Sequence, residues 1–179
     1  MRLFVAIDLP EEVKESIWNV SERLKRIKGL KVVERENLHI TLKFLGEVKE
    51  SSIKEISERL SGINSEPFSV SVEGIGSFPS KKRPRVIWVG INRGYDEILL
   101  LKKKIDVSLS PMFGSEKRFS PHITIARAKY PLKWSLIDDV ISGFREQIFG
   151  GFEVLGFSLK KSILKPEGPL YSDILNVRF

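Results

Sequence analysis

Two histidines and two threonines are the residues of this 179-residue chain whose types and spacing most strongly suggest chemistry. They are the only histidines and threonines in the sequence, and each threonine stands two positions after a histidine. The resulting strings are His39-Ile40-Thr41-Leu42 and His122-Ile123-Thr124-Ile125. Two threonines placed at random would both take that offset in about one chain in 10⁴, so the repeated spacing indicates a common function.

Both strings are typical of β-strands, in which alternate side chains point to opposite faces. The histidine and threonine of each string therefore share one face, and the neighbouring apolar residues share the face that packs on a core. A lone strand histidine is usually structural, and threonine is common in strands. Two matching strings that hold every histidine and threonine favour an active site instead.

Two imidazoles suit a reaction that needs a proton donor and a proton acceptor together. With an ordinary pKa near 6.5, one histidine can take a proton from a nucleophile while the other protonates a leaving oxygen. A threonine hydroxyl can donate a hydrogen bond to a phosphoryl oxygen as charge develops there. The four side chains predict in-line displacement at phosphorus, with no metal and no cofactor.

Two other hydrolytic chemistries match the sequence less well. A zinc site would need a third ligand, and the two histidines lack the spacing of recognised zinc motifs. A serine hydrolase would carry a Gly-x-Ser-x-Gly elbow, which is absent, and would leave one histidine without a role.

Charge and composition narrow the possible partners and the cellular location of the protein. The chain has 30 Lys and Arg against 23 Asp and Glu, a net charge of +7, which suits an anionic partner such as RNA but also simply keeps a protein soluble. The absence of cysteine excludes disulfides and thiolate chemistry. No apolar stretch approaches the roughly 20 residues of a membrane span, and the apolar start meets Asp8 too early for a secretory leader. We expect a cytoplasmic protein that does not bind membranes.

Apolar periodicity and turn residues predict alternating strands and helices. Ser52 and Glu55 resemble a capping box that opens a helix, and a basic, proline-bounded loop is expected at 78–84. Strands are expected at 2–9, 31–34, 37–44, 68–75, 85–91, 121–129, 152–164 and 170–179, and helices at 10–29, 52–63, 95–109 and 135–148. Each half of the chain holds one His-Ile-Thr string, and no linker separates the halves. The sequence thus predicts one α+β domain over residues 1–179, made of two related lobes.

The paired His-x-Thr-hydrophobic tetrads resemble those of the 2H phosphoesterases, and more narrowly the RNA 2',3'-cyclic phosphodiesterases, also called 2'-5' RNA ligases. The flanking segments that share the likeness are Arg2-Leu3-Phe4-Val5-Ala6-Ile7, Lys43-Phe44-Leu45-Gly46, Ser120-Pro121, Ala126-Arg127 and Gly168-Pro169-Leu170-Tyr171. The resemblance spans essentially the whole chain. It implies a bilobal, pseudo-twofold fold, with antiparallel sheets flanked by helices and both tetrads facing a central cleft.

The resemblance also implies an activity: hydrolysis of an RNA or nucleoside 2',3'-cyclic phosphate to a 2'-phosphate, with reversible 2'-5' joining of RNA ends in vitro. Its partners would be RNA with a 2',3'-cyclic phosphate or 5'-hydroxyl end, transfer-RNA fragments among them, and the protein would be a monomer. In that family picture His39 protonates the departing 3'-oxygen, His122 activates water, and Thr41 and Thr124 hold the phosphate. The sequence by itself does not order the two histidine roles.

Phe44 and Arg127 each stand five residues after their histidine, where the family is expected to place a base-contacting aromatic and a phosphate-contacting arginine. Simple strand alternation points both away from the histidine face. Either the strands end or bulge before them, or their length brings them to the cleft rim. The alternative is a core phenylalanine and a surface arginine.

Tyr171 and the basic segment 81–85 are candidates for binding RNA beyond the scissile group, through stacking and phosphate attraction, although solvated charge also explains the basic segment.

Two other functions stay open. The same site could act on another cyclic phosphate or on the 3' end of a small RNA. The chain could also be a non-catalytic RNA- or nucleotide-binding module, although binding alone does not require an imidazole pair.

Overall fold

Nine strands form the sheet of the computed structural model, which describes residues 1–116 and 118–179. The strands are β1 (Arg2–Asp8), β2 (Leu30–Val32), β3 (His39–Glu47), β4 (Phe68–Ser80), β5 (Arg83–Ile91), β6 (His122–Ala128), β7 (Ile148–Val154), β8 (Gly156–Leu164) and β9 (Pro169–Arg178). The α-helices in these residues are α1 (Glu11–Leu24), α2 (Ile53–Ser61), α3 (Tyr95–Leu109) and α4 (Trp134–Ile141). The predicted α+β class is therefore confirmed.

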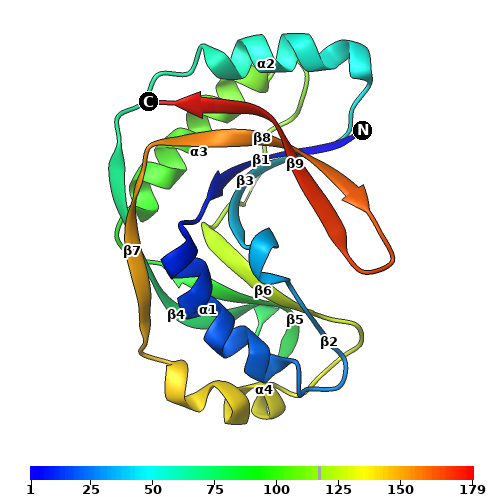
Figure 1. Cartoon of the computed structure of the whole chain (residues 1–179), viewed down its shortest axis with the longest axis vertical. Coiled ribbons are helices and arrows are strands. Elements are labelled where there is room, and N and C mark those ends of the chain that lie inside the picture. Colours follow the sequence, from blue (N-terminus) through cyan, green and yellow to red (C-terminus); the bar gives the residue numbers. More distant parts are fainter. Residues whose placement is uncertain (117) are drawn as a thin grey trace.

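The sheet runs in the order β7-β4-β5-β6-β3-β1-β8-β9, with β2 paired to β6, and the strand pairs are antiparallel (Figure 1). The two strands that carry the His-Ile-Thr strings, β3 and β6, are neighbours at its centre. Antiparallel pairing allows one face of a sheet to be packed and the other to remain open. The centre of the sheet can therefore hold both a core and a site.

The helices divide this sheet into two lobes. Helices α1 and α4 pack on each other in the lobe of β7, β4, β5 and β6, and helices α2 and α3 pack on each other in the lobe of β3, β1, β8 and β9 (Figure 1). With β2 and β7 left aside, the order β1-α1-β3-α2-β4 recurs as β5-α3-β6-α4-β8, with equivalent neighbours in the sheet. This repetition is the predicted pseudo-twofold arrangement.

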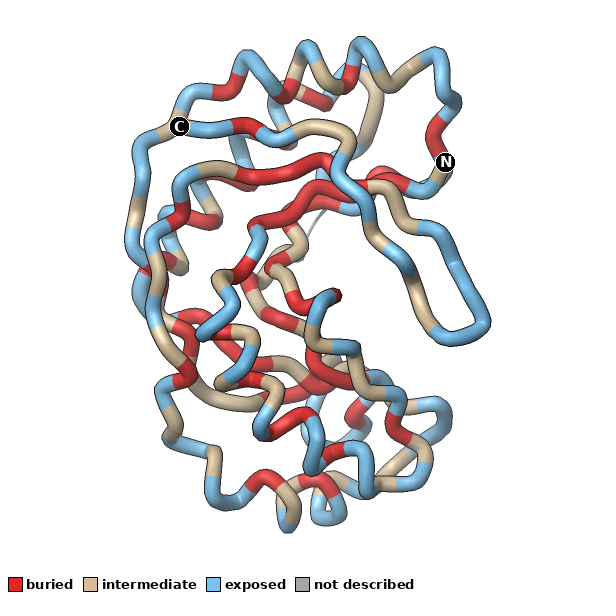
Figure 2. Tube along the Cα trace, viewed as in Figure 1, coloured by how far each residue is buried: buried red, intermediate tan, exposed pale blue. Residues whose placement is uncertain are grey.

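The lobes are not the two halves of the sequence, because each lobe exchanges a helix with the other. Helix α1 follows β1 but packs on β7, β2 and β6, and α3 follows β5 but packs on β3. Buried residues lie along the strands and the inward faces of these helices (Figure 2). On α1 the buried apolar positions are Val13, Ile17, Val20 and Leu24, the helical spacing that the sequence predicted.

Several local predictions were wrong. Ser52 does not cap α2, because it belongs to the 3-10 turn Glu50–Ser52 and has a helical backbone, so its hydroxyl makes no capping hydrogen bond. The predicted loop at 78–84 is instead the end of the β4–β5 hairpin. The predicted strand 152–164 is two strands, β7 and β8. A side chain at Gly156, where β8 begins, would collide with the Val177 carbonyl oxygen.

Within residues 1–116 and 118–179, no helix has the length and apolar composition needed to cross a bilayer.

Candidate active site

The two His-Ile-Thr strings meet because Ile40 of β3 lies directly opposite Ile123 of β6. Both isoleucines are fully buried on one face of the sheet. In antiparallel strands this register places the residue before Ile40 next to the residue after Ile123, and the reverse. His39 is thus a neighbour of Thr124, and Thr41 is a neighbour of His122, on the opposite face from the isoleucines.

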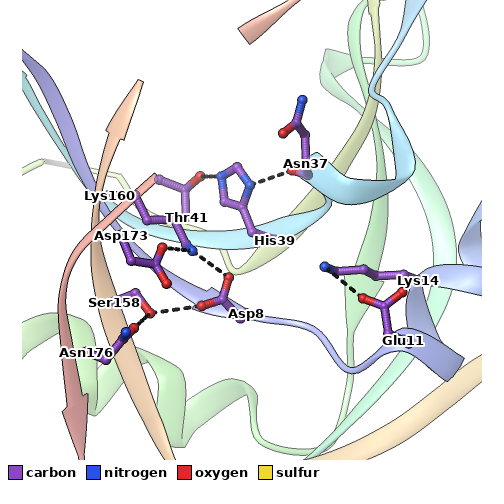
Figure 3. A network of polar contacts seen from close by, with 10 residues as sticks. All are labelled: Asp8, Glu11, Lys14, Asn37, His39, Thr41, Ser158, Lys160, Asp173 and Asn176. Atoms are coloured by element: carbon purple, nitrogen blue, oxygen red, sulfur yellow. Dashed lines mark hydrogen bonds and ion pairs between the residues drawn. The ribbon is translucent and has the colours of Figure 1, made fainter. Parts of the chain in front are cut away.

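Hydrogen bonds define the protonation of His39. Its Nδ1 lies 2.7 Å from the backbone carbonyl oxygen of Asn37, and its Nε2 lies 2.8 Å from the Thr41 hydroxyl (Figure 3). A carbonyl can only accept, so Nδ1 carries the proton of the neutral ring, and Nε2 is left as an acceptor from the Thr41 hydroxyl. The nitrogen with the free lone pair is the one beside the threonine.

His122 is held in the same way. Its Nδ1 donates to the backbone carbonyl oxygen of Ser120 at 2.7 Å, again two residues upstream. The ring of His122 contacts the ring of Phe78 edge-on, with centroids 4.9 Å apart, while the ring of His39 contacts those of Phe4 and Tyr171, at 5.0 and 5.5 Å. Each imidazole is therefore fixed by one carbonyl and by aromatic neighbours, with Nε2 left for chemistry.

Burial lowers the pKa of His39 to about 4, an effect that Lys160 and His122 reinforce and that the Asn37 carbonyl and Asp8 oppose. Burial also lowers the pKa of His122, as does the charge of Arg127, against the Ser120 hydrogen bond. Both imidazoles are consequently neutral at pH 7 in the free protein. A bound phosphate anion would favour the protonated form of either ring.

An ion cluster beside His39, in which Lys160 is buried and its two carboxylate partners are partly exposed, was not anticipated from the sequence. The Lys160 ammonium of β8 lies 2.8 Å from Asp8 and 2.5 Å from Asp173, and the Ser158 hydroxyl donates to Asp8 at 2.9 Å (Figure 3). Although burial opposes it, these two carboxylates raise the pKa of Lys160 above its ordinary value. Asp8 pairs with His39 across β1 and β3. Strand alternation places Lys160 on the same face of β8 as Ser158 and Ser162, so nothing in the sequence indicated that this lysine is buried.

A cleft of about 970 Å³ opens in front of the His-x-Thr face. It is bounded by β1, β3, the end of β6, β2 and the β8–β9 hairpin. The predicted site residues that line it are His39, Thr41, Phe44, Thr124, Arg127 and Tyr171. The remaining predicted residue, His122, reaches the same face through the β3–β6 register. Among the described residues, no three or more His, Asp or Glu side chains are grouped so that they could hold a metal ion.

Phe44 reaches the cleft because β3 contains a register shift. Val5 of β1 pairs with Lys43 while Ala6 pairs with Thr41, which leaves Leu42 as an extra residue. Leu42 and Lys43 are consecutive yet both buried, so the alternation of faces reverses after Thr41. Phe44 consequently lies on the histidine face, 60% exposed, and is not a core residue.

Arg127 reaches the cleft by the matching shift in β6. Ile87 of β5 pairs with Ala126 while Trp88 pairs with Thr124, which leaves Ile125 as the extra residue. Ile125 and Ala126 are both buried, and Arg127 then points to the cleft with its side chain exposed. Of the arrangements considered for these two positions, the bulge is the one present.

Tyr171 lies at the same wall, 4.9 Å from the Phe4 ring. Burial raises the pKa of Tyr171, while the charges of Arg127 and Arg2 oppose that rise. The basic segment 81–85 is elsewhere: it is not part of the cleft lining, and the Lys81 ammonium sits 5.2 Å from the ring centre of Trp134 on α4.

Comparison with known proteins gives consistent matches over most of the chain. Residues 7–88 match the family described as LigT-like phosphoesterase. The RNA 2',3'-cyclic phosphodiesterase of Methanocaldococcus jannaschii is 43% identical over 97% of this chain and 98% of its own, and that of Archaeoglobus fulgidus is 41% identical over the same shares. The RNA 2',3'-cyclic phosphodiesterase of Thermotoga maritima is 41% identical over 100% of this chain and 96% of its own.

Solved structures agree with these relatives. The crystal structure of TT0787 of Thermus thermophilus has a TM-score of 0.80 at 31% identity, covering 99% of this chain and 97% of that one. The apo form of E. coli LigT has a TM-score of 0.77 at 27% identity, covering 99% and 96%. E. coli LigT complexed with 3'-AMP has a TM-score of 0.76 at 26% identity, covering 99% and 97%. With its paired His-x-Thr strands, its fold and these full-length relatives, the chain belongs to the LigT-like phosphoesterases of the 2H group.

Proposed function

We propose that this protein hydrolyses RNA 2',3'-cyclic phosphates to 2'-phosphates by two-histidine acid–base catalysis. The observation that carries the proposal is the Ile40–Ile123 pairing, which brings two imidazoles and two threonine hydroxyls onto one face of the sheet. The names of the relatives support the substrate class, as does the 3'-AMP complex of E. coli LigT. Residues 1–179 would act as one domain.

In the proposed reaction His122 accepts a proton at Nε2 from a water molecule, whose oxygen attacks the phosphorus. The bond between phosphorus and the 3'-oxygen breaks, and His39 gives that oxygen a proton from Nε2, which leaves a 2'-phosphate and a 3'-hydroxyl. Thr41, Thr124 and Arg127 would donate to the phosphoryl oxygens as negative charge grows. Phe44 and Tyr171 would contact the terminal base.

The low pKa of His39 places one requirement on this scheme. A ring with a pKa of about 4 is neutral at pH 7, so it must gain its proton when the phosphate anion binds. The Thr41 hydroxyl, which donates to Nε2 in the free protein, can then turn to a phosphoryl oxygen. Substrate binding would thus prepare the acid that the reaction consumes.

The same residues would also join RNA ends through a 2'-5' bond. If a 5'-hydroxyl attacks the phosphorus in place of water, the bond between phosphorus and the 3'-oxygen breaks as before. The product is a 2'-5' phosphodiester with a free 3'-hydroxyl. The partners we infer are RNA with 2',3'-cyclic phosphate or 5'-hydroxyl ends, transfer-RNA fragments among them. We place the protein in the cytoplasm, as a monomer.

One assay tests the proposal. The protein is incubated in excess EDTA with an RNA oligonucleotide that ends in a 2',3'-cyclic phosphate, and the terminal phosphate of the product is identified. We expect a 2'-phosphate and an undiminished rate in EDTA. Absence of turnover, or its loss in EDTA, would overturn the mechanism, and a 3'-phosphate would overturn the assigned polarity. Parallel assays with other cyclic phosphates test the substrate class.

A further inference from the structure

A group of cations borders the cleft along strand β2. Lys31 of β2 is the direct antiparallel partner of Arg127 of β6, and Lys129 follows Arg127 by two residues. The Lys129 backbone N–H donates to the Gly29 carbonyl oxygen at 2.8 Å, which continues the pairing past the end of β2. All three cationic side chains are exposed, and all three line the cleft. We refer to Lys31, Arg127 and Lys129 as the β2-edge cations.

This arrangement is unfavourable unless an anion is bound. Like charges directly opposite each other on neighbouring strands destabilise a sheet. Among residues 1–116 and 118–179, no carboxylate forms an ion pair with any β2-edge cation. Of the two acidic residues that line the cleft, Glu34 is paired with Lys25 at 3.8 Å, and Glu167 lies in the β8–β9 turn. The positive charge of the edge is left for a ligand.

The wall of the cleft formed by the β8–β9 hairpin carries apolar side chains, which complement the positive charge of the β2 edge. The tip of the β8–β9 hairpin contributes Leu164, Pro166 and Pro169, and Leu164 is 69% exposed. In Figure 1 this hairpin projects from the sheet on the same side as β2. A single RNA strand carries phosphates along one side and base faces along the other, and proteins bind it with a basic groove and apolar surfaces. The cleft offers both.

The size of the cleft also favours more than one nucleotide. Its volume of about 970 Å³ lies at the upper end of the roughly 300–1,000 Å³ that small-molecule sites occupy. One end holds His39 and Thr41, and the lining continues to Lys31 and Lys129. Arg127 lines the same cleft as His39 and Thr41, and it is also the strand partner of Lys31 and lies two residues from Lys129. It therefore connects the His-x-Thr end of the cleft to the cationic end.

We infer that the β2-edge cations form a second phosphate subsite, which binds the phosphodiester on the 5' side of the terminal nucleotide and makes RNA ends better substrates than cyclic mononucleotides. This inference rests on the proposed function. It moves the RNA path away from the basic segment 81–85, whose charges lie outside the cleft lining. That segment supplies a control of equal charge.

The test compares two substrates in three proteins. The substrates are an RNA oligonucleotide ending in a 2',3'-cyclic phosphate and a nucleoside 2',3'-cyclic monophosphate with no 5' phosphate. The proteins are the wild type, Lys31→Ala/Lys129→Ala, and the control Lys82→Ala/Arg83→Ala, which removes the same charge from exposed positions. The measured quantity is the ratio of kcat/KM for the RNA to kcat/KM for the mononucleotide. Thermal unfolding verifies that each variant is folded.

We expect the Lys31→Ala/Lys129→Ala variant to lower this ratio by about tenfold, mainly through KM for RNA. Loss of the contacts to one phosphate of a single strand should also reduce the slope of log(kcat/KM) against log[salt] by about 0.7. The control should keep the wild-type ratio. An unchanged ratio in the β2 variant, or an equal fall in the control, would overturn the subsite. Failure of the wild type to hydrolyse either substrate would instead overturn the proposed function.

Discussion

Ile40 and Ile123 lie opposite each other where the two central strands pair, and both are fully buried. Neither can take part in the reaction, yet their pairing sets the relative positions of the two histidines and the two threonines. Each isoleucine holds a histidine and a threonine on the other side of its strand. The geometry of the proposed catalytic residues is thus a property of the β3–β6 register, and shifting that register by one residue would turn these side chains inward.

Replacing either histidine should nearly abolish activity. Because a positioned acid or base contributes about 10²–10⁴-fold, we expect His39→Ala and His122→Ala each to lower kcat on RNA 2',3'-cyclic phosphate by at least about 100-fold. Steady-state kinetics with product identification measures this. Wild-type turnover in either variant would show that the pair does not act as acid and base.

A sulfur-substituted substrate separates the two histidine roles. When the 3'-oxygen of the cyclic phosphate is replaced by sulfur, the leaving group is a thiolate, which needs little protonation because a thiol has a pKa near 8.5. His39→Ala should then regain at least tenfold in rate relative to the oxygen substrate, and His122→Ala should regain nothing. Recovery in His122→Ala alone would reverse the assignment.

Stability should depend on pH through His39. In the unfolded chain its pKa is near 6.5, and in the folded protein it is about 4, so between these values only the unfolded state binds the proton. The contribution is complete above pH 6.5, and the free energy of unfolding falls by up to about 1.4 kcal/mol per pH unit as the pH drops toward 4.

Urea unfolding at several pH values between 7 and 4.5 measures this dependence. Carboxylates also titrate in that range, so the comparison is with His39→Asn, which cannot bind the proton. The variant should lose less stability than the wild type over the interval. Parallel curves for the two proteins would contradict the low pKa.

Phe44 should matter for substrate and not for folding, because it is 60% exposed and lines the cleft. Base stacking on an aromatic side chain contributes about 1–3 kcal/mol, so Phe44→Ala should lower kcat/KM for RNA by roughly 5- to 150-fold with little change in unfolding midpoint. Leu100→Ala, equally exposed on α3, is the control. A large loss of stability in Phe44→Ala, with unchanged kinetics, would make the residue structural.

Lys43, the buried residue that follows Leu42 of the β3 bulge, should be important for stability. Its ammonium lies 2.6 Å from Asp106 and 2.7 Å from the Gly114 carbonyl oxygen, and its side chain is only 2% exposed. Breaking a buried ion pair costs about 3 kcal/mol or more, so Lys43→Ala should lower the unfolding free energy by that amount in urea titrations. Lys54→Ala, 87% exposed on α2, should change it by less than about 0.5 kcal/mol. Equal effects would refute the role of the buried pair.

The His-x-Thr faces were predictable because strand alternation is a local property of the sequence. The bulges at Leu42 and Ile125 were not, since each arises from pairing with a distant strand, β1 or β5, that fixes which residue is extra. The positions of Phe44 and Arg127 therefore stayed open until the register was known. The Lys160 cluster could not be predicted for a related reason. Asp8 is far from Lys160 in the sequence, and the two side chains meet only because β1 pairs with β8.

The exchanged helices have a mechanical consequence. Only Leu9 and Pro10 connect β1 to α1, and only residues 92–94 connect β5 to α3. Each of these short connections runs from one lobe to the other. Separating the lobes would therefore displace α1 or α3 from the lobe on which it packs. The positions of α1 and α3 and the separation of the two lobes are thus coupled through connections of two and three residues.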